Sequence, residues 1–513
     1  METKLRPSPD SEDYEHRAIL LFIRGLATYR EKNDEKALAL YHDAIIADPD
    51  CAECWFAMAL SLQRAEYSIE QQVAAYKRCL ELDNDFALAH LKYGLILADR
   101  RAYDAAEKEL EMAAHLDANN GDTLLAFAEF ETDIRQNHQT AEKYVQKALQ
   151  VAPRNSRAHN LYAMLLLHIK QNYFLAEKHF RLALEADSCN AIARNNYAHL
   201  LAQIRKNYDD AEMHYRLAVE ADPKLAIAHY NYANLLKTIR CDYDLAQKHY
   251  ELAIEYEPMS ALAHNNLANL YYDIRKDPDK AQHHYELALL ADPKNASAHT
   301  NLGLLKHVVR QQYDEAEKHY KSALAVNATH ADAHNNLGYL LQTVRGNFDL
   351  AEKHYQAALE SDPNHAFTHE SYGELLFDVH HAYDDAENHL KLALDQNPNL
   401  LTAHLKLGEL YLHVRDDPEL ALDFLSNALE LDPNNTSALY NIASLYEQRG
   451  ALKQAALYLE RLVVVLSSSS SAQSDQHNKI LSDDDLPQQR RSMLEDINKR
   501  LALIIKRQQQ EET

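Results

Sequence analysis

Asparagine side chains recur at one position of this chain at intervals of 35 residues, and their carboxamides are the groups most capable of recognising a ligand. Each carboxamide offers two donors and two acceptor sites. Asparagine is a poor residue for a helix interior, so its repetition implies a role for the amide. The chemistry that fits is hydrogen bonding to the backbone of an extended peptide. The five positions are Asn196, Asn231, Asn266, Asn301 and Asn336.

Histidine forms two further columns with the same period. Equivalent residues of successive repeats should lie roughly 10 Å apart, about one helix diameter, which is too far for one metal ion to bind both. A single column therefore forms no metal site, whereas pairing across the columns within a repeat, such as His264 with His284, remains open. We expect packing and hydrogen-bonding roles rather than metal binding or pH sensing. The first column is His90, His159, His229, His264, His299, His334, His369 and His404, and the second is His179, His214, His249, His284, His319, His354 and His389.

Cysteine offers the remaining reactive side chains, in a lone CxxC motif formed by Cys51 and Cys54. No second pair stands at zinc-ligand spacing. Five cysteines in 513 residues predict reduced thiols in a cytosolic or nuclear setting, so we interpret the motif as small core-lining thiols. The sequence contains no GxSxG, no HExxH and no phosphate-binding loop. We therefore predict no enzymatic activity, no catalytic residue, no metal and no cofactor.

The elements that must position these side chains are helices, because the whole pattern repeats every 34 or 35 residues. A small residue recurs at this spacing from Gly25 to Ala443. Later in each unit an alanine, an aromatic residue and a second alanine follow one another, as in Ala246, Tyr250 and Ala253. Spacings of three and four place these side chains on one helical face. A fixed period of this length indicates stacked helix pairs, each burying its apolar face against its neighbours.

This pattern resembles the tetratricopeptide repeat (TPR) family over residues 14–465. The resemblance implies an all-α fold, a right-handed superhelical solenoid of about 13 tandem TPR-like helix pairs. Most units carry one extra residue between their two helices, in segments such as 204–211. We expect this longer turn to change local geometry and superhelical pitch rather than the fold.

In this family the first helix of each pair lines a concave groove, and the asparagine column is similar to that in the TPR domain of O-linked N-acetylglucosamine transferases. Nothing after the repeats resembles the catalytic region of those enzymes. The resemblance implies that the asparagine column binds the backbone of an extended segment, and the tyrosines further along the same helices are expected to anchor its side chains. The alternative is that the amides hold neighbouring repeats together. The predicted peptide-binding residues are Asn195, Asn196, Asn231, Asn234, Asn265, Asn266, Asn269, Tyr272, Asn301, Asn335, Asn336 and Tyr339.

The two ends differ in composition from the repeats. Residues 1–13 are predicted to be a disordered N-terminus, and residues 466–488 a flexible linker rich in serine and aspartate. Residues 489–510 return to a helical pattern that is apolar on one face and basic elsewhere. We expect this helix to cap the solenoid, with autoinhibition of the groove or recruitment of another protein as alternatives.

The composition restricts the class of partner. A formal net charge of −25 disfavours nucleic acid, because neutralising phosphates requires clustered lysine and arginine. No signal peptide opens the chain, and no apolar run is long enough to insert into a membrane. We predict a cytoplasmic, or nuclear, non-enzymatic scaffold that binds proteins or peptides. The alternatives are a substrate-targeting subunit of a separate enzyme and a structural subunit of a large assembly.

Overall fold

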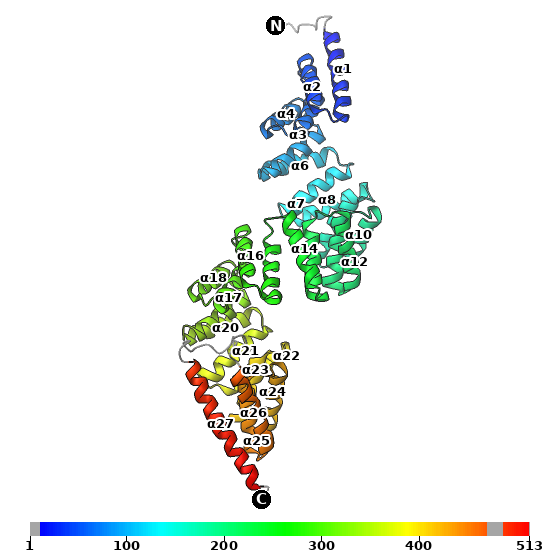
Figure 1. The fold of residues 1–513 in the computed structure, drawn as a ribbon. Helices are drawn as coiled ribbons and strands as arrows, with labels where there is room; N and C mark the ends of the chain where they lie inside the picture. Colours follow the sequence, from blue (N-terminus) through cyan, green and yellow to red (C-terminus); the bar gives the residue numbers. More distant parts are fainter. Residues whose placement is uncertain (1–10, 469–485, 512–513) are drawn as a thin grey trace. The chain divides into compact units, whose positions relative to one another are not determined.

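The chain is built from paired helices. The computed structural model describes residues 11–468 and 486–511, and every regular element in these ranges is a helix. The helices fall into two units, Met1–Tyr256 and Glu257–Thr513, each a row of helix pairs (Figure 1). The described residues contain 13 such pairs. The prediction of an all-α repeat solenoid is therefore confirmed.

The bounds of the helices follow the repeat closely in both units. Unit 1 contains α1 (Ser11–Arg30), α2 (Asp34–Ala47), α3 (Ala52–Arg64), α4 (Ile69–Leu82), α5 (Ala87–Asp99), α6 (Tyr103–Leu116), α7 (Gly121–Asp133), α8 (His138–Val151), α9 (Ser156–His168), α10 (Tyr173–Ala186), α11 (Ala191–Leu200), η1 (Leu201–Arg205), α12 (Tyr208–Ala221), α13 (Ala226–Leu235), η2 (Leu236–Arg240) and α14 (Tyr243–Tyr256). Unit 2 contains α15 (Ala261–Leu270), η3 (Tyr271–Arg275), α16 (Pro278–Ala291), α17 (Ala296–Val308), α18 (Tyr313–Val326), α19 (Ala331–Thr343), α20 (Phe348–Ser361), α21 (Ala366–Leu375), η4 (Leu376–His380), α22 (Tyr383–Gln396), α23 (Leu401–His413), α24 (Pro418–Leu431), α25 (Thr436–Gln448), α26 (Leu452–Ser468) and α27 (Leu486–Glu511).

The core of most repeats is the small-residue column packed against an aromatic residue of the following helix, which is replaced by leucine at Leu110, Leu390 and Leu425. Ala246, Tyr250 and Ala253 are almost completely buried. A Cβ atom added at Gly303 would lie 2.7 Å from Cε1 of Tyr320. The small residue is therefore required because the aromatic ring of the second helix occupies the space beside it.

The turn between paired helices contains the extra residue. In four repeats the first helix ends in a short π-helical turn, η1 to η4. A residue with positive φ follows the first helix of every pair, as at Lys206 (φ 55°) and Lys276 (φ 54°). Units with and without the extra residue therefore reverse the chain through one left-handed residue, and the extra residue leaves the helix pairing intact.

Ion pairs link successive repeats at their edges. Arg135 reaches back to Asp104 at 2.6 Å, and Arg240 reaches back to Glu212 at 2.7 Å. Such exposed pairs contribute only about 0–1 kcal/mol each. Their role is to hold the angle between neighbouring repeats.

The helix bounds differ from the predicted domain bounds at both ends. Helix α1 begins at Ser11, inside the segment 1–13 expected to be disordered, and residues 1–10 lie outside the described residues. Helices α26 and α27 also extend into the predicted linker, whose residues 469–485 lie outside the described ranges. None of the helices described is both long and apolar enough to cross a bilayer.

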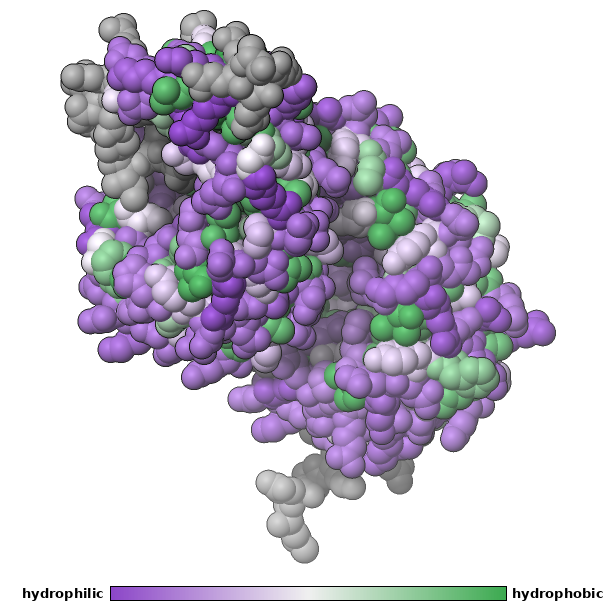
Figure 2. Space-filling view, turned by 90° about the horizontal axis from the view of Figure 1, so that it is seen from below, coloured by the Kyte–Doolittle hydropathy of each residue, from purple (hydrophilic) through white to green (hydrophobic). Residues whose placement is uncertain are grey.

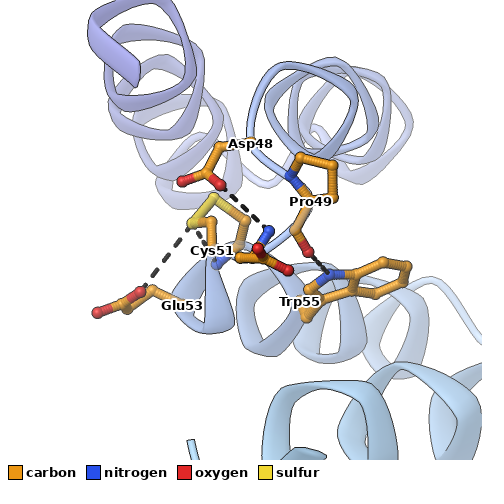
Figure 3. Close-up of a disulfide and its surroundings, with 7 residues drawn as sticks. Asp48, Pro49, Cys51, Glu53 and Trp55 are labelled. Atoms are coloured by element: carbon orange, nitrogen blue, oxygen red, sulfur yellow. Dashed lines mark hydrogen bonds between the residues drawn. A yellow bond between two sulfur atoms is a disulfide. The ribbon is translucent and has the colours of Figure 1, made fainter. Parts of the chain in front are cut away.

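The CxxC motif forms a disulfide at the start of α3 (Figure 3). Cys51 caps the helix, and its Sγ accepts a hydrogen bond from the backbone N–H of Cys54 at 3.2 Å. This first turn brings the two Cα atoms to 5.3 Å, inside the range that a disulfide requires. The expectation of reduced thiols is therefore wrong for Cys51 and Cys54, because the helix cap places the two sulfurs side by side.

Candidate functional site

The first helices of successive pairs form one continuous face in each unit, which we call the inner face. Helices α17, α19, α21 and α23 each contact the next in the series, as do α9, α11 and α13. Successive second helices approach one another less closely. Each row of pairs therefore curves with its first helices on the inside. Of the predicted site residues, Asn195, Asn196, Asn231 and Asn234 belong to unit 1, and the other eight belong to unit 2.

In unit 1 the asparagine side chains bond to one another across repeats. Asn231 Nδ2 donates to Asn195 Oδ1 at 2.9 Å, and Asn195 Nδ2 donates to Asn196 Oδ1 at 3.0 Å. Asn196 Nδ2 then donates to Asn160 Oδ1 in the preceding repeat at 3.1 Å. The amides thus form a chain of hydrogen bonds that ties three repeats together.

Unit 2 repeats this arrangement and adds a tyrosine. Asn301 Nδ2 donates to Oδ1 of Asn265 at 3.1 Å and to Oδ1 of Asn269 at 3.0 Å. Asn265 in turn donates to Asn266 at 3.2 Å, and the hydroxyl of Tyr285 donates to Asn269 at 2.6 Å. Asn265 is buried, whereas Asn266, Asn269 and Asn301 remain partly exposed on the inner face.

We call these hydrogen-bonded amides the asparagine ladder, and it ends at the next repeat. Asn335 Nδ2 donates to Asn336 Oδ1 at 3.3 Å, but Oδ1 of Asn335 is buried without a hydrogen-bond partner. The donor that would reach it, 36 residues further on, is replaced by Ser371. The amides of the ladder therefore link neighbouring repeats by hydrogen bonds, and one buried acceptor, Oδ1 of Asn335, is left unsatisfied at its end.

Two tyrosines on the inner face of unit 2 have hydroxyls that make no hydrogen bond within the described residues. Tyr272 lies in η3 and Tyr339 in α19, and each ring is partly exposed. Burial raises the pKa of Tyr339 to about 12, and burial with the charge of Asp273 raises that of Tyr272. Both phenols are thus neutral donors at pH 7, available to a ligand.

The two histidine columns meet in six hydrogen-bonded pairs. Nδ1 of His229 lies 2.8 Å from Nδ1 of His249, and Nδ1 of His264 lies 3.0 Å from that of His284. Nε2 of His229 also lies 3.0 Å from the carbonyl of Pro223, to which it must donate. The first-helix histidine therefore accepts at Nδ1 from its partner. The other pairs are His159–His179, His299–His319, His334–His354 and His369–His389.

In each pair the first-column histidine has both ring nitrogens in hydrogen bonds, and Nδ1 of the second-column histidine bonds to it. Within the described ranges, no group of three or more histidine, cysteine, aspartate or glutamate side chains is arranged to hold a metal ion. The cross-column pairing left open by the sequence is what the structure contains, as a repeated hydrogen-bonding unit.

The C-terminal helix α27 lies against the last repeat. Its apolar residues Ile497 and Ile504 are almost fully buried in a cluster that includes Leu462 of α26. On the adjoining side Arg500 donates to Glu447 at 2.6 Å and to Ser444 Oγ at 3.0 Å. Both acceptors lie on α25, the first helix of the last pair, so Arg500 occupies the end of the inner face.

Hydrophilic residues dominate the surface in the view of Figure 2, and apolar residues are scattered among them.

The sequence of the inner face shows which residues the site prediction missed. Glu374 follows Tyr339 in the same inner-face column, and Glu409 comes next. Glu409 accepts a hydrogen bond from Ser437, whereas Glu374 has no hydrogen-bond partner within the described residues. The position of the two residues in the column does not reveal this difference.

Comparisons with known proteins agree with this architecture. A profile of the tetratricopeptide repeat matches residues 306–366 and 414–471. A search of curated proteins finds no match. Among solved structures, a chain of the APC/C hetero-tetramer Cut9–Hcn1 is 15% identical, with 94% of this chain and 96% of that chain covered and a TM-score of 0.54. This likeness shows the fold alone.

Two further structures match with lower TM-scores. YrrB, described as a TPR protein with an unusual peptide-binding site, is 22% identical over 37% of this chain and 95% of its own, with a TM-score of 0.30. Yeast Tom70 is 17% identical over 96% of this chain and 99% of its own, with a TM-score of 0.37. These scores are too low to support any argument about this chain.

Proposed function

This chain belongs to the tetratricopeptide-repeat proteins, and we propose that it is a non-catalytic scaffold that binds an extended segment of a partner protein along the inner face of unit 2. Its repeat solenoid is of the kind that mediates protein interaction. The finer proposal, an extended ligand on this face, depends on the side chains that the fold itself does not use.

The observation that carries the proposal is a set of unsatisfied polar groups in one row of repeats. The hydroxyls of Tyr272 and Tyr339 have no partner within the described residues, and the Asn336 amide donates no hydrogen bond there. An extended peptide presents a carbonyl or N–H about every 3.3 Å. It would therefore supply partners to these groups while its side chains contact the two aromatic rings.

The asparagines contribute to both of the roles considered. The amides of the ladder bond to their neighbours, as Asn195 and Asn265 do with one donor and one acceptor each, while Asn301 and Asn336 also remain partly exposed on the inner face. Replacing all of them would therefore break the repeats apart as well as remove a binding surface. The tyrosines give the cleaner test, since the fold makes no hydrogen bond to their hydroxyls.

We would compare proteins captured from lysate by the wild-type chain and by the double variant Tyr272→Ala/Tyr339→Ala. The matched control is Tyr103→Ala, which removes an exposed tyrosine from the second helix of a pair in unit 1. Circular dichroism establishes that each variant remains helical. We expect the double variant to lose at least about ten-fold in recovery of a defined partner set, the loss expected for two aromatic anchors.

Two results would count against the proposal. If the folded double variant recovers the same partners as wild type, the inner face of unit 2 is not the binding surface. If Tyr103→Ala loses the same partners, the effect of the double variant is not specific to that face.

A second candidate function, a subunit of a larger assembly, is favoured by the N-terminal helix. Ile19, Leu20 and Ile23 of α1 are each more than half exposed, whereas the last repeat is covered by α27. An apolar stripe on an end helix is typical of a surface that another subunit covers. Under this alternative, Ile19→Glu/Ile23→Glu removes partners that the tyrosine variant retains.

A further inference from the structure

An excess of carboxylates lies on the inner face at the repeats formed by α21, η4 and α23. We call this set the acidic section, and it consists of Glu370, Glu374, Asp378 and Glu409. The charge of Lys406 on α23 acts on Glu374 against the charges of Glu370, Asp378 and Glu409. The section therefore carries a net negative charge beside Tyr339 of the proposed binding surface.

Three of these carboxylates are already satisfied by the fold. Glu370 accepts from the backbone N–H of Ala403 at 3.1 Å. Asp378 holds the ammonium of Lys406, with both oxygens at 2.8 Å. Glu409 accepts from the hydroxyl of Ser437 at 3.1 Å and lies 3.6 Å from Lys406 Nζ.

Glu374 differs from them, since it has no hydrogen bond or ion pair within the described residues. Burial and the carboxylates of Asp378, Glu370 and Glu409 outweigh Lys406 and raise the pKa of Glu374 to about 7. An unpaired, desolvated carboxylate is costly to the fold. Glu374 remains partly exposed on the inner face, where a ligand can reach its carboxylate and supply the missing partner.

The chain itself demonstrates the interaction in its last repeat. Ser444 stands in the inner-face column of Glu374 and Glu409, spaced by 35 residues. There Arg500 of α27 inserts its guanidinium, which donates to Ser444 and Glu447 and lies 5.1 Å above the ring of Tyr440. The inner face therefore accepts a basic side chain brought to it by another helix, with a carboxylate and an aromatic ring as partners.

We propose that the acidic section binds a lysine or arginine side chain of the partner segment, with Glu374 as its ion-pair partner. The inference rests on the proposed function, because the same segment must lie along the inner face of unit 2. It adds the chemistry of the ligand, a basic residue placed one repeat beyond the contact with Tyr339. A charge-assisted hydrogen bond of this kind is stronger than a neutral one and favours one register of the segment.

The test is selection from a random dodecapeptide display library on four purified full-length chains. These are wild type, Glu374→Gln, the exposed-face control Glu430→Gln and the double variant Tyr272→Ala/Tyr339→Ala. We expect wild type and Glu430→Gln to enrich peptides with lysine or arginine at one fixed position. Glu374→Gln should still select peptides but without that enrichment.

A selected peptide then gives the quantitative measurement. Replacing its basic residue by norleucine should weaken binding to wild type by at least about ten-fold, and should leave binding to Glu374→Gln unchanged. Basic enrichment that persists on Glu374→Gln, or wild-type peptides with no basic preference, would overturn this inference and leave the proposed function standing. Failure of wild type to select any peptide, or equal selection by the tyrosine double variant, would overturn the proposed function and this inference with it.

Discussion

At the residue scale, the asparagine column shows how far spacing predicts a role. The period placed the amides on one face, and the structure has them in hydrogen-bonded chains from Asn231 to Asn160 and from Asn301 to Asn266. A carboxamide at this spacing suits either a ligand or the next repeat. The sequence could not decide between them, because the distance between neighbouring amides depends on how closely successive first helices pack.

The end of the ladder gives a residue-scale prediction, Ser371→Asn. The new side chain would place its Nδ2 where it can donate to the buried, unsatisfied Oδ1 of Asn335. We expect the free energy of unfolding to rise by about 1 kcal/mol, the net value of a buried hydrogen bond, measured by urea unfolding. The control Ser371→Leu has a side chain with the same number and branching of heavy atoms as asparagine but no donor. Equal stabilities for the two variants would show that Asn335 gains no bond.

At the element scale, the turn between paired helices was predicted to be longer but not to contain a left-handed residue. The left-handed conformation could not be predicted from residue type here, since residues as different as Lys206, Cys241 and Lys276 all adopt it. Only two of the turns use the residue that adopts it freely, Gly346 and Gly450. The fold imposes the conformation because helix pairing fixes both ends of the turn.

Gly346→Ala tests that imposed conformation. Gly346 has φ of 62° and no atom within 4 Å of an added Cβ, so the substitution changes backbone strain and not packing. We expect unfolding free energy to fall by about 1–2 kcal/mol, the cost of a left-handed non-glycine residue, in urea titrations. The matched control is Gln311→Ala, at the same turn position with φ of 56°, which should be close to neutral. A similar loss in both variants would point to a side-chain effect.

At the scale of the whole molecule, the period predicted the helix pairs almost completely, whereas partners that lie outside the period were not predicted. The disulfide between Cys51 and Cys54 depends on one helix cap, and the contact of Arg500 with Glu447 joins segments 53 residues apart. The predicted binding residues did not include Glu374, whose lack of a hydrogen-bond partner among the described residues emerges only when the neighbouring side chains are placed. The repeat thus predicts the helix pairs, whereas residues whose contacts depart from the repeat, such as Glu374, mark the candidate site.

The histidine pairs extend through both units and make the stability of the whole molecule sensitive to acid. Burial, followed by the charge of the facing histidine, lowers the pKa of His179, His249, His284, His319 and His354 to about 4. An unfolded histidine titrates near 6.5. Between these values the unfolded chain binds protons that the folded chain does not. Stability is therefore full above about pH 6.5 and is lost progressively as the pH falls toward 4.

The last prediction is that replacing second-column histidines by phenylalanine removes part of this dependence. The chain supplies the precedent, since Phe424 packs against His404 at the position where six other repeats have a histidine pair. We expect the urea midpoint of wild type to fall steeply from pH 7 to pH 4.5. The triple variant His284→Phe/His319→Phe/His354→Phe should show a shallower fall, even if its midpoint at pH 7 is lower. Because carboxylates titrate equally in both proteins, identical slopes would mean that the pairs are not the source of acid sensitivity.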